Sequence, residues 1–154
     1  MYLTQLEQEI DINFLIEKHS KEQVTSLFPF INLSQRQLFY DDLKGKRTGM
    51  NSSEKKFANC LMDNGYILYH EPKISECVRV PDFLVCKKGF LDNSLQVSVV
   101  EITTMSLFQK GADKRKFEQI RDLEEVCEIH DLRFKALFKE DLNVLYDIGP
   151  DNFF

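Results

Sequence analysis

Two hydrophobic segments, residues 78–86 and 95–104, set the framework of this chain, and each carries one acidic residue. Valine is frequent in both, and a stretch with glycine, asparagine and aspartate separates them. β-Branched and aromatic residues favour strands, whereas the intervening residues favour a turn. The pattern therefore predicts a β-hairpin with Asp82 in its first strand and Glu101 in its second.

The period of a strand decides which way Glu101 points. Successive side chains alternate between the two faces of a sheet, so Glu101 shares a face with Val97 and Val99, opposite to Val100 and Ile102. That face is predicted to meet a core or a pocket. A buried carboxylate without a partner is unfavourable, so Glu101 requires a partner, a proton or a metal ion.

Pro81-Asp82, followed by Glu101-Ile102-Thr103, resembles the motif of the PD-(D/E)XK nuclease superfamily, which includes restriction endonucleases, Holliday-junction resolvases and transposon-end nucleases. The resemblance implies an α/β fold with a restriction-endonuclease-like core: a helix, a three-stranded antiparallel meander, a second helix and a further strand. In that family the third motif ends in lysine, whereas this chain has Thr103.

The resemblance also implies a metal site. Asp82 and Glu101 correspond to the two acids that bind a divalent cation, Mg²⁺ or Mn²⁺, and the backbone carbonyl of Ile102 is a third ligand. Two carboxylates about 4 Å apart repel each other by roughly 4 kcal/mol at an effective dielectric constant near 20, and a hard cation removes this repulsion. Thr103 can hydrogen-bond a water or a phosphate oxygen, but it cannot supply the charge of the missing lysine.

A helix is predicted from residue 51 or 52 to Gly65. Glu54 falls in the middle of its apolar face, which Phe57, Ala58, Leu61 and Met62 form, rather than opposite to it. The resemblance implies that such an acid joins the metal site. Asn51 and Glu54 also have the spacing of a capping box, in which Glu54 only bonds the helix start. Both interpretations of Glu54 remain open.

A second helix is predicted over residues 112–129. Lys116 lies close to its inward face near the helix start, whereas Lys110 and Lys114 point largely away. Lys116 can therefore bring its ammonium group to the site that Thr103 leaves uncharged, as displaced lysines do in the resembled family. In the alternative interpretation, its long stem runs from the edge of the core to water.

Three further elements complete the predicted core. Residues 66–72 form a first strand, residues 134–138 a fourth strand, and residues 140–146 a closing helix or turn. His70, near the end of the first strand, has two interpretations. It contacts substrate or metal, or it is a histidine without a functional role whose hydrogen bonds are satisfied within the protein. Glu71 is a further candidate acid at the same place.

The beginning of the chain has a different pattern. Apolar residues at helical spacing predict three helices, at residues 3–18, 20–28 and 34–43. We interpret residues 1–45 as a helical appendage that packs on the main domain or on a second subunit, residues 44–51 as a linker, and residues 51–154 as the core. The apolar faces of these helices are where a homodimer contact is predicted.

Composition limits the class of protein. With 154 residues, 43% hydrophobic and 29% charged, the chain is typical of one globular domain, alone or with a small appendage. No apolar run approaches the about 20 residues of a membrane span, and a signal-peptide pattern is lacking, so we expect a cytoplasmic or other intracellular protein without membrane contact. The four cysteines show no C-x-x-C spacing and are predicted to be core residues.

The net charge of −5 is unfavourable for nucleic-acid binding, but basic residues are locally clustered. Each cluster forms either a phosphate-binding side or a solvated surface. The candidates for nucleic-acid contact are Lys44, Lys46, Arg47, Lys110, Lys114 and Arg115.

Three hypotheses follow for function. The first is a magnesium-dependent endonuclease that hydrolyses phosphodiester bonds in DNA. The second is a catalytically degenerate, nuclease-like subunit that binds nucleic acid or assembles with proteins, and the third is an unrelated α/β protein. For the first hypothesis the catalytic candidates are Asp82, Glu101, Lys116 and Thr103, and the candidate metal ligands are Glu54, Asp82, Glu101 and Ile102.

Overall fold

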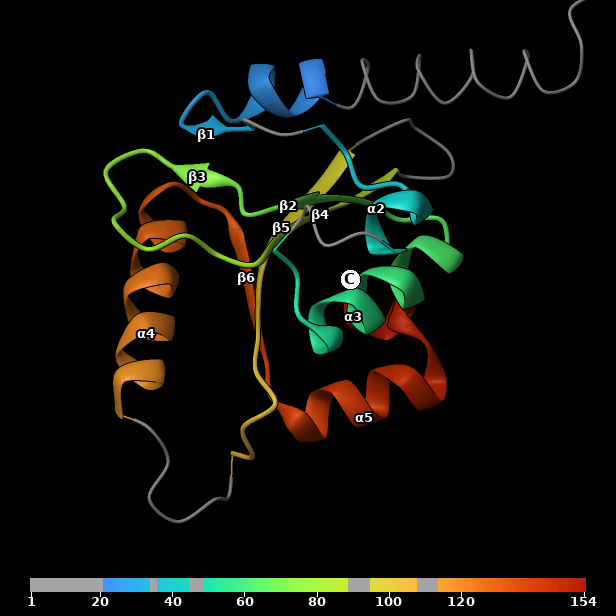
Figure 1. Ribbon diagram of the computed structural model, residues 1–154. Helices are drawn as coiled ribbons and strands as arrows, with labels where there is room; N and C mark the ends of the chain where they lie inside the picture. The colour runs from blue at the N-terminus through green and yellow to red at the C-terminus, as the bar shows by residue number, and fades with distance from the viewer. Residues whose placement is uncertain (1–20, 34–35, 45–48, 89–94, 108–113) are drawn as a thin grey trace, which may run out of the picture.

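A computed structural model describes residues 21–33, 36–44, 49–88, 95–107 and 114–154 of the protein (Figure 1). These residues form a mixed α/β structure with two sheets. Within these ranges, no helix is both long enough and apolar enough to cross a membrane.

A four-stranded sheet in the order β2-β4-β5-β6 lies at the centre. Its strands are β2 (Ile67–His70), β4 (Phe83–Lys88), β5 (Leu95–Ile102) and β6 (Arg133–Leu137). The first three are antiparallel, and β6 is parallel to β5. A parallel pair requires a crossover, which contains α4 (Lys114–Ile129). The α/β class and the antiparallel meander are therefore confirmed.

The first strand of the hairpin is shorter than predicted. Strand β4 begins at Phe83 and not at residue 78, and the side chain of Val78 is 97% exposed. Pro81 has no backbone N–H to donate to a neighbouring strand, so regular pairing starts only beyond it. Asp82 consequently lies just before the strand, although its carbonyl still accepts a hydrogen bond from the Glu71 N–H at 2.9 Å.

Helices cover both faces of the central sheet (Figure 1). α3 (Ser52–Asp63) and α5 (Lys139–Ile148) pack on one face, where they share a hydrophobic cluster with Val100 and Ile102 of β5. α4 covers the other face, where its Cys127 joins a cluster with Val97 and Val99. The predicted alternation of side chains along β5 is thus confirmed.

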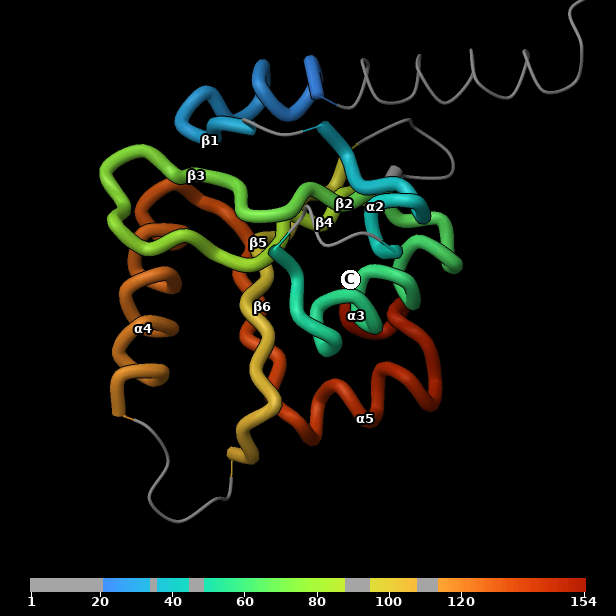
Figure 2. Tube along the Cα trace, viewed as in Figure 1, coloured from blue at the N-terminus to red at the C-terminus, as the bar shows by residue number. Residues whose placement is uncertain are grey.

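The N-terminal segment is not the purely helical appendage that the sequence predicted. Residues 21–27 are helical, but β1 (Ile31–Asn32) forms a two-stranded antiparallel sheet with β3 (Lys73–Ile74) (Figure 2). Ile31 is buried together with Tyr69 and Leu84 of the central sheet, so burial of its apolar side chain favours a strand between the second and third predicted helices. The predicted helix at residues 3–18 lies outside the described residues.

The next predicted helix also forms only in part. Residues 36–39 are not helical, and the Leu38 N–H donates a hydrogen bond to the Leu68 carbonyl at 2.8 Å. This contact extends the edge of the sheet, and the helix α2 (Tyr40–Lys44) begins after it. The described part of this segment therefore packs on the core. Half of the predicted linker, residues 45–48, lies outside the described residues.

The ends of the other elements follow local signals. Asn51 caps α3 by accepting a hydrogen bond from the Glu54 N–H, and Gly65 just past the end of α3 has a φ of +84°, which favours glycine. Beyond α5, the short helix η1 (Pro150–Asn152) is fixed by a hydrogen bond of 2.7 Å from the Tyr66 hydroxyl to the Asp151 carboxylate. All four cysteines are free, and two of them are buried.

Candidate active site

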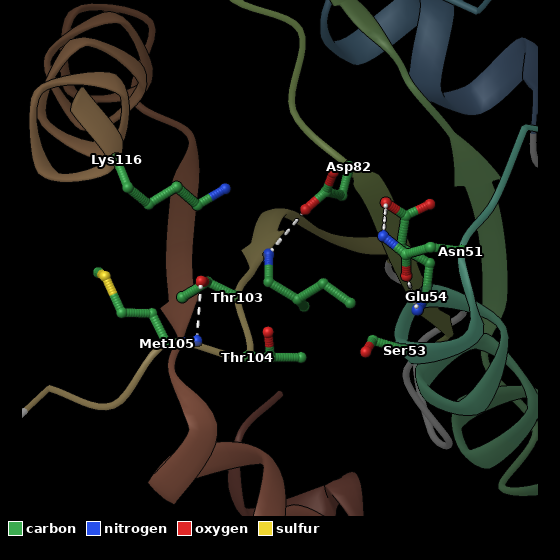
Figure 3. A pocket seen from close by; sticks show the side chains of 9 residues that line it. Asn51, Ser53, Glu54, Asp82, Thr103, Thr104, Met105 and Lys116 are labelled. Carbon is green, nitrogen blue, oxygen red and sulfur yellow. Dashed lines mark hydrogen bonds between the residues drawn. The ribbon is translucent and has the colours of Figure 1, made fainter. Parts of the chain in front are cut away.

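A cleft of about 540 Å³ opens beside the end of β5, between the starts of α3 and α4 (Figure 3). It is lined by Asn51, Ser53, Glu54, Asp82, Ile102, Thr103, Thr104, Met105 and Lys116. Many of these side chains are polar, and they come from segments that are distant in the sequence. The cleft therefore gathers several of the residues that the sequence singled out.

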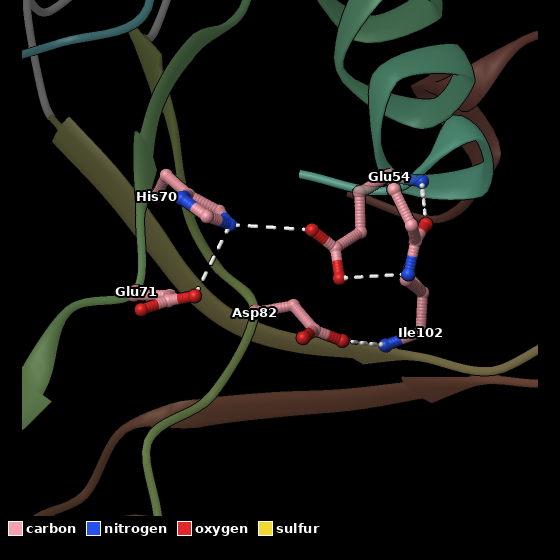
Figure 4. Close-up of polar contacts among 6 residues, drawn as sticks. Glu54, His70, Glu71, Asp82 and Ile102 are labelled. Carbon is pink, nitrogen blue, oxygen red and sulfur yellow. Dashed lines mark hydrogen bonds and ion pairs between the residues drawn. The ribbon is translucent and has the colours of Figure 1, made fainter. Parts of the chain in front are cut away.

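Asp82 and Glu101 form a carboxyl pair at this cleft. The register that pairs Phe83 with Val100 brings Asp82 opposite Glu101. A carboxylate oxygen of Asp82 accepts a hydrogen bond of 2.9 Å from the Ile102 N–H, which fixes its direction (Figure 4). Glu101 is only 1% exposed. The prediction that the two acids lie inward and close together is confirmed.

Burial and the proximity of Asp82 change the protonation of Glu101. Burial is the largest cause that raises the Glu101 pKa to about 9, followed by its hydrogen bond with Asp82 and the charge of Asp82. The positive charge of Lys116 acts in the opposite direction. At neutral pH Glu101 therefore keeps its proton in the absence of a cation.

Two side chains of α4 reach Glu101. The Lys116 Nζ lies 3.7 Å from its Oε2, and the Gln119 Nε2 donates a hydrogen bond of 3.1 Å to the same oxygen. The predicted position of Lys116 is confirmed, and its ammonium group supplies a positive charge where Thr103 cannot. Gln119 was not predicted, although its spacing of three from Lys116 places both residues on one face of a helix.

Thr103 lies in the cleft, as predicted, but its hydroxyl oxygen accepts a hydrogen bond of 3.1 Å from the Met105 N–H. The Thr103 N–H donates to the Leu137 carbonyl of β6 at 2.9 Å. Both bonds shape the chain as it leaves β5. The hydroxyl hydrogen of Thr103 remains able to donate to a ligand in the cleft.

Glu54 takes part in the helix start and also lines the cleft. It lines the cleft, and its backbone N–H donates the capping hydrogen bond to Asn51 Oδ1 at 2.9 Å, while Asn51 Nδ2 donates to its Oε1 at 3.2 Å. The other carboxylate oxygen lies 3.3 Å from Nε2 of His70 (Figure 4). Participation of Glu54 in a metal site therefore stays a prediction.

His70 is buried beside the cleft rather than exposed within it. Its Nε2 also lies 3.6 Å from the Glu71 carboxylate, and its Nδ1 is buried without a hydrogen-bond partner in the described structure. Figure 4 shows His70 between these two acids. This arrangement orients Glu54 through His70, and no contact places His70 among the residues that line the cleft.

The donors available to a cation are oxygens. Within the described ranges, no group of three or more His, Cys, Asp or Glu residues is gathered so as to hold a metal ion. A site here would consist of the Asp82 and Glu101 carboxylates, the carbonyl of Ile102 and water. An all-oxygen set of this kind suits magnesium or manganese better than zinc.

The predicted nucleic-acid contacts are described only in part. Lys44 is exposed at the end of α2, and Lys114 and Arg115 are exposed at the start of α4, close in sequence to Lys116. The other three candidates, Lys46, Arg47 and Lys110, lie outside the described residues.

No protein-family model, curated protein or solved structure matches this chain.

Proposed function

We propose that the protein is a metal-dependent endonuclease that hydrolyses phosphodiester bonds in DNA. The observation that carries this proposal is the pairing of the Asp82 and Glu101 carboxyl groups at the cleft, with Lys116 Nζ 3.7 Å from Glu101. Two acids and one lysine at one place provide the ligands for a cation and a positive charge for a phosphate.

The order of elements supports the same proposal. Helix α3, the antiparallel strands β2, β4 and β5, helix α4 and the parallel strand β6 follow the order that the resemblance implies for a restriction-endonuclease-like core. Asp82 precedes the middle strand of the three, and Glu101 lies in the next one. We therefore propose that these elements form a restriction-endonuclease-like core.

The residues present fit a divalent cation. Burial, followed by the hydrogen bond with Asp82 and the charge of Asp82, raises the pKa of Glu101, so an ionised Glu101 needs a cation to compensate its charge. Asp82, Glu101 and the carbonyl of Ile102 would hold Mg²⁺ or Mn²⁺. When bound, such an ion polarises the phosphodiester and lowers the pKa of a bound water.

The side chains of the protein itself supply positioning and charge. Gln119 fixes the orientation of Glu101, and the Ile102 N–H fixes that of Asp82. Lys116 lines the open cleft, where its ammonium group can hydrogen-bond a phosphate oxygen or orient the attacking water. Thr103 can donate one further hydrogen bond to the same oxygens.

A cleavage assay tests the proposal. Supercoiled, linear and branched DNA are incubated with Mg²⁺ or Mn²⁺ and with the native protein, Asp82→Asn or Lys116→Gln. We expect native cleavage, at least a 100-fold loss for Asp82→Asn, and a partial loss for Lys116→Gln that exceeds tenfold. Asp147→Asn and Lys73→Gln, at exposed positions, are the matched controls. Full cleavage by Asp82→Asn contradicts the proposal.

A second candidate function is a nuclease-like subunit that binds nucleic acid, or assembles with a protein or a second copy of the chain, without cleaving. The observation that favours it is Thr103, which is uncharged where the family motif has lysine and is engaged with the Met105 N–H. Saturable DNA binding with no cleavage in Mg²⁺ or Mn²⁺ supports this candidate, and any cleavage that Asp82→Asn abolishes excludes it.

A further inference from the structure

A second pocket, of about 340 Å³, adjoins the cleft. The two share Ser53 and Thr104, which lie in Figure 3 on the side of the cleft nearer to α5. The second pocket is lined by Ser53, Lys56, Thr104, Lys139, Leu142, Asn143 and Tyr146. A ligand that extends from the cleft along this side therefore enters a pocket between α3 and α5.

The chemistry of this pocket differs from that of the cleft. Leu142 and the ring of Tyr146 give it an apolar wall, and Lys56 and Lys139 give it positive charge. No acidic residue is among its lining residues, and neither lysine forms an ion pair with a carboxylate of the described chain. The pocket thus suits a ligand with one flat apolar part and one or more anionic groups.

Lys56 and Tyr146 are already in contact. The Lys56 Nζ lies 4.4 Å from the centre of the Tyr146 ring. An exposed cation–π contact of this kind changes an equilibrium constant by about two- to fivefold, whereas stacking of a nucleobase on an aromatic ring contributes about fivefold to 150-fold. A base can therefore displace the ammonium group from the ring, and the released group is free to bind a phosphate.

The size of the pocket selects the form of the nucleic acid. Its volume of about 340 Å³ is at the lower end of the range of small-ligand pockets, about 300–1,000 Å³, and suits one nucleotide rather than a base pair. A base of an intact duplex must leave the stack to enter it, which is unfavourable, whereas an unpaired base enters directly. Burial raises the pKa of Tyr146 to about 12, so its hydroxyl stays neutral next to phosphate.

We infer that the pocket between α3 and α5 binds one unpaired nucleotide of the strand whose phosphodiester occupies the cleft, with the base on Tyr146 and Leu142 and the phosphate on Lys56 and Lys139. The inference rests on the proposed function for the identity of the polymer. It narrows the substrate to DNA with an unpaired nucleotide beside the scissile phosphate, such as a flap, a bulge or a branch point.

Binding without cleavage tests the pocket separately from catalysis. Two labelled oligonucleotides of the same sequence are used in EDTA, one fully paired and one with a single unpaired 2-aminopurine. Fluorescence anisotropy measures the affinity of each, and 2-aminopurine quenching reports stacking. We expect the native protein to prefer the unpaired probe by at least tenfold and to quench it.

Variants test which residues cause the preference for the unpaired probe and the quenching of 2-aminopurine. We expect Tyr146→Leu to reduce quenching and to lower the affinity for the unpaired probe by fivefold or more, with little change for the paired probe. Lys56→Gln, at an exposed position that does not disturb the core, and Lys139→Gln are each expected to weaken binding severalfold. In each variant, the slope of the logarithm of the binding constant against the logarithm of the salt concentration should become less steep by about 0.7, as expected for the loss of one phosphate contact. Lys73→Gln is the matched control.

The outcomes separate this inference from the proposed nuclease function. If the native protein cleaves DNA but Tyr146→Leu and Lys56→Gln bind both probes as the native protein does, the pocket assignment is wrong and the nuclease proposal stands. If the native protein shows the expected preference but does not cleave, the assignment stands and the nuclease proposal fails. Failure to bind either probe overturns the assignment.

Discussion

Replacement of Glu101 by glutamine tests the carboxyl pair directly. Glutamine has nearly the shape of a protonated glutamate and can still hydrogen-bond Asp82, but it cannot ionise. The native side chain is 1% exposed and its pKa is raised to about 9 from 4.5. We expect Glu101→Gln to abolish cleavage. Without metal, we also expect the free energy of unfolding of this variant to change less with pH than that of the native protein.

Proton linkage determines whether the stability of the native protein rises or falls with pH. The folded protein keeps the Glu101 proton up to about pH 9, whereas the unfolded chain releases it near pH 4.5. Stability from this group is therefore fully present below pH 4.5 and is lost progressively as the pH rises to 9. The slope is about 1.4 kcal/mol per pH unit, so the loss between pH 5 and pH 7 is on the order of 3 kcal/mol.

Denaturant unfolding at pH 5, 7 and 9 in EDTA measures this loss. The native free energy of unfolding is expected to fall about 3 kcal/mol further than that of Glu101→Gln between pH 5 and pH 7. Saturating Mg²⁺ should reduce the pH dependence of the free energy of unfolding of the native protein, because the cation replaces the proton on Glu101. It should leave the pH dependence of the variant unchanged. Glu118→Gln, an exposed acid on α4, is the control. Equal pH dependence of the native protein and Glu101→Gln would refute the reasoning.

Three further predictions concern the supports of the site and the core. Gln119→Leu removes the hydrogen bond to Glu101, and we expect kcat/KM for DNA cleavage to fall by about tenfold or more while the fold is retained. Leu61→Ala deletes a fully buried side chain, so the free energy of unfolding should fall by about 2–5 kcal/mol in denaturant titrations. Asn51→Ala removes the cap of α3 and should lower the same free energy by about 1 kcal/mol, with recovery in Asn51→Asp.

Each of these three has a result that contradicts it. Native kcat/KM in Gln119→Leu at every Mg²⁺ concentration would exclude a positioning role. A change in Leu61→Ala no larger than that of Val144→Ala, an exposed position, would mean that Leu61 does not pack in the core. Equal losses in Asn51→Ala and Asn51→Asp would show that the cap does not stabilise α3.

Much of the core could be predicted because its signals are local. The period of two along β5 placed Glu101 on the face opposite to Val100, and the helical period of α4 placed Lys116 toward the site. The cap at Asn51 is likewise a short-range pattern that the structure contains. These features depend on neighbours within a few residues, which a sequence displays directly.

The errors arose where distant contacts override local preference. Strand β1 lies between two predicted helices and gains a partner in β3, and Leu38, within the helix predicted at residues 34–43, gains one in Leu68; both partners come later in the chain. Gln119 was missed because its role depends on the position of α4 against β5. Lys56 and Lys139 were missed because only packing of α3 beside α5 brings them to one pocket.

The sequence by itself determined the chemical groups: two acids on the two hydrophobic segments of the hairpin, an inward lysine on a helix, and the uncharged Thr103. Side-chain periodicity was sufficient for this because each assignment concerns one element. The tertiary structure decided the carboxyl pairing, the cleft that opens on it and the neighbouring pocket. These features depend on strand register and on crossing over from β5 to β6, which place residues far apart in the chain within contact distance.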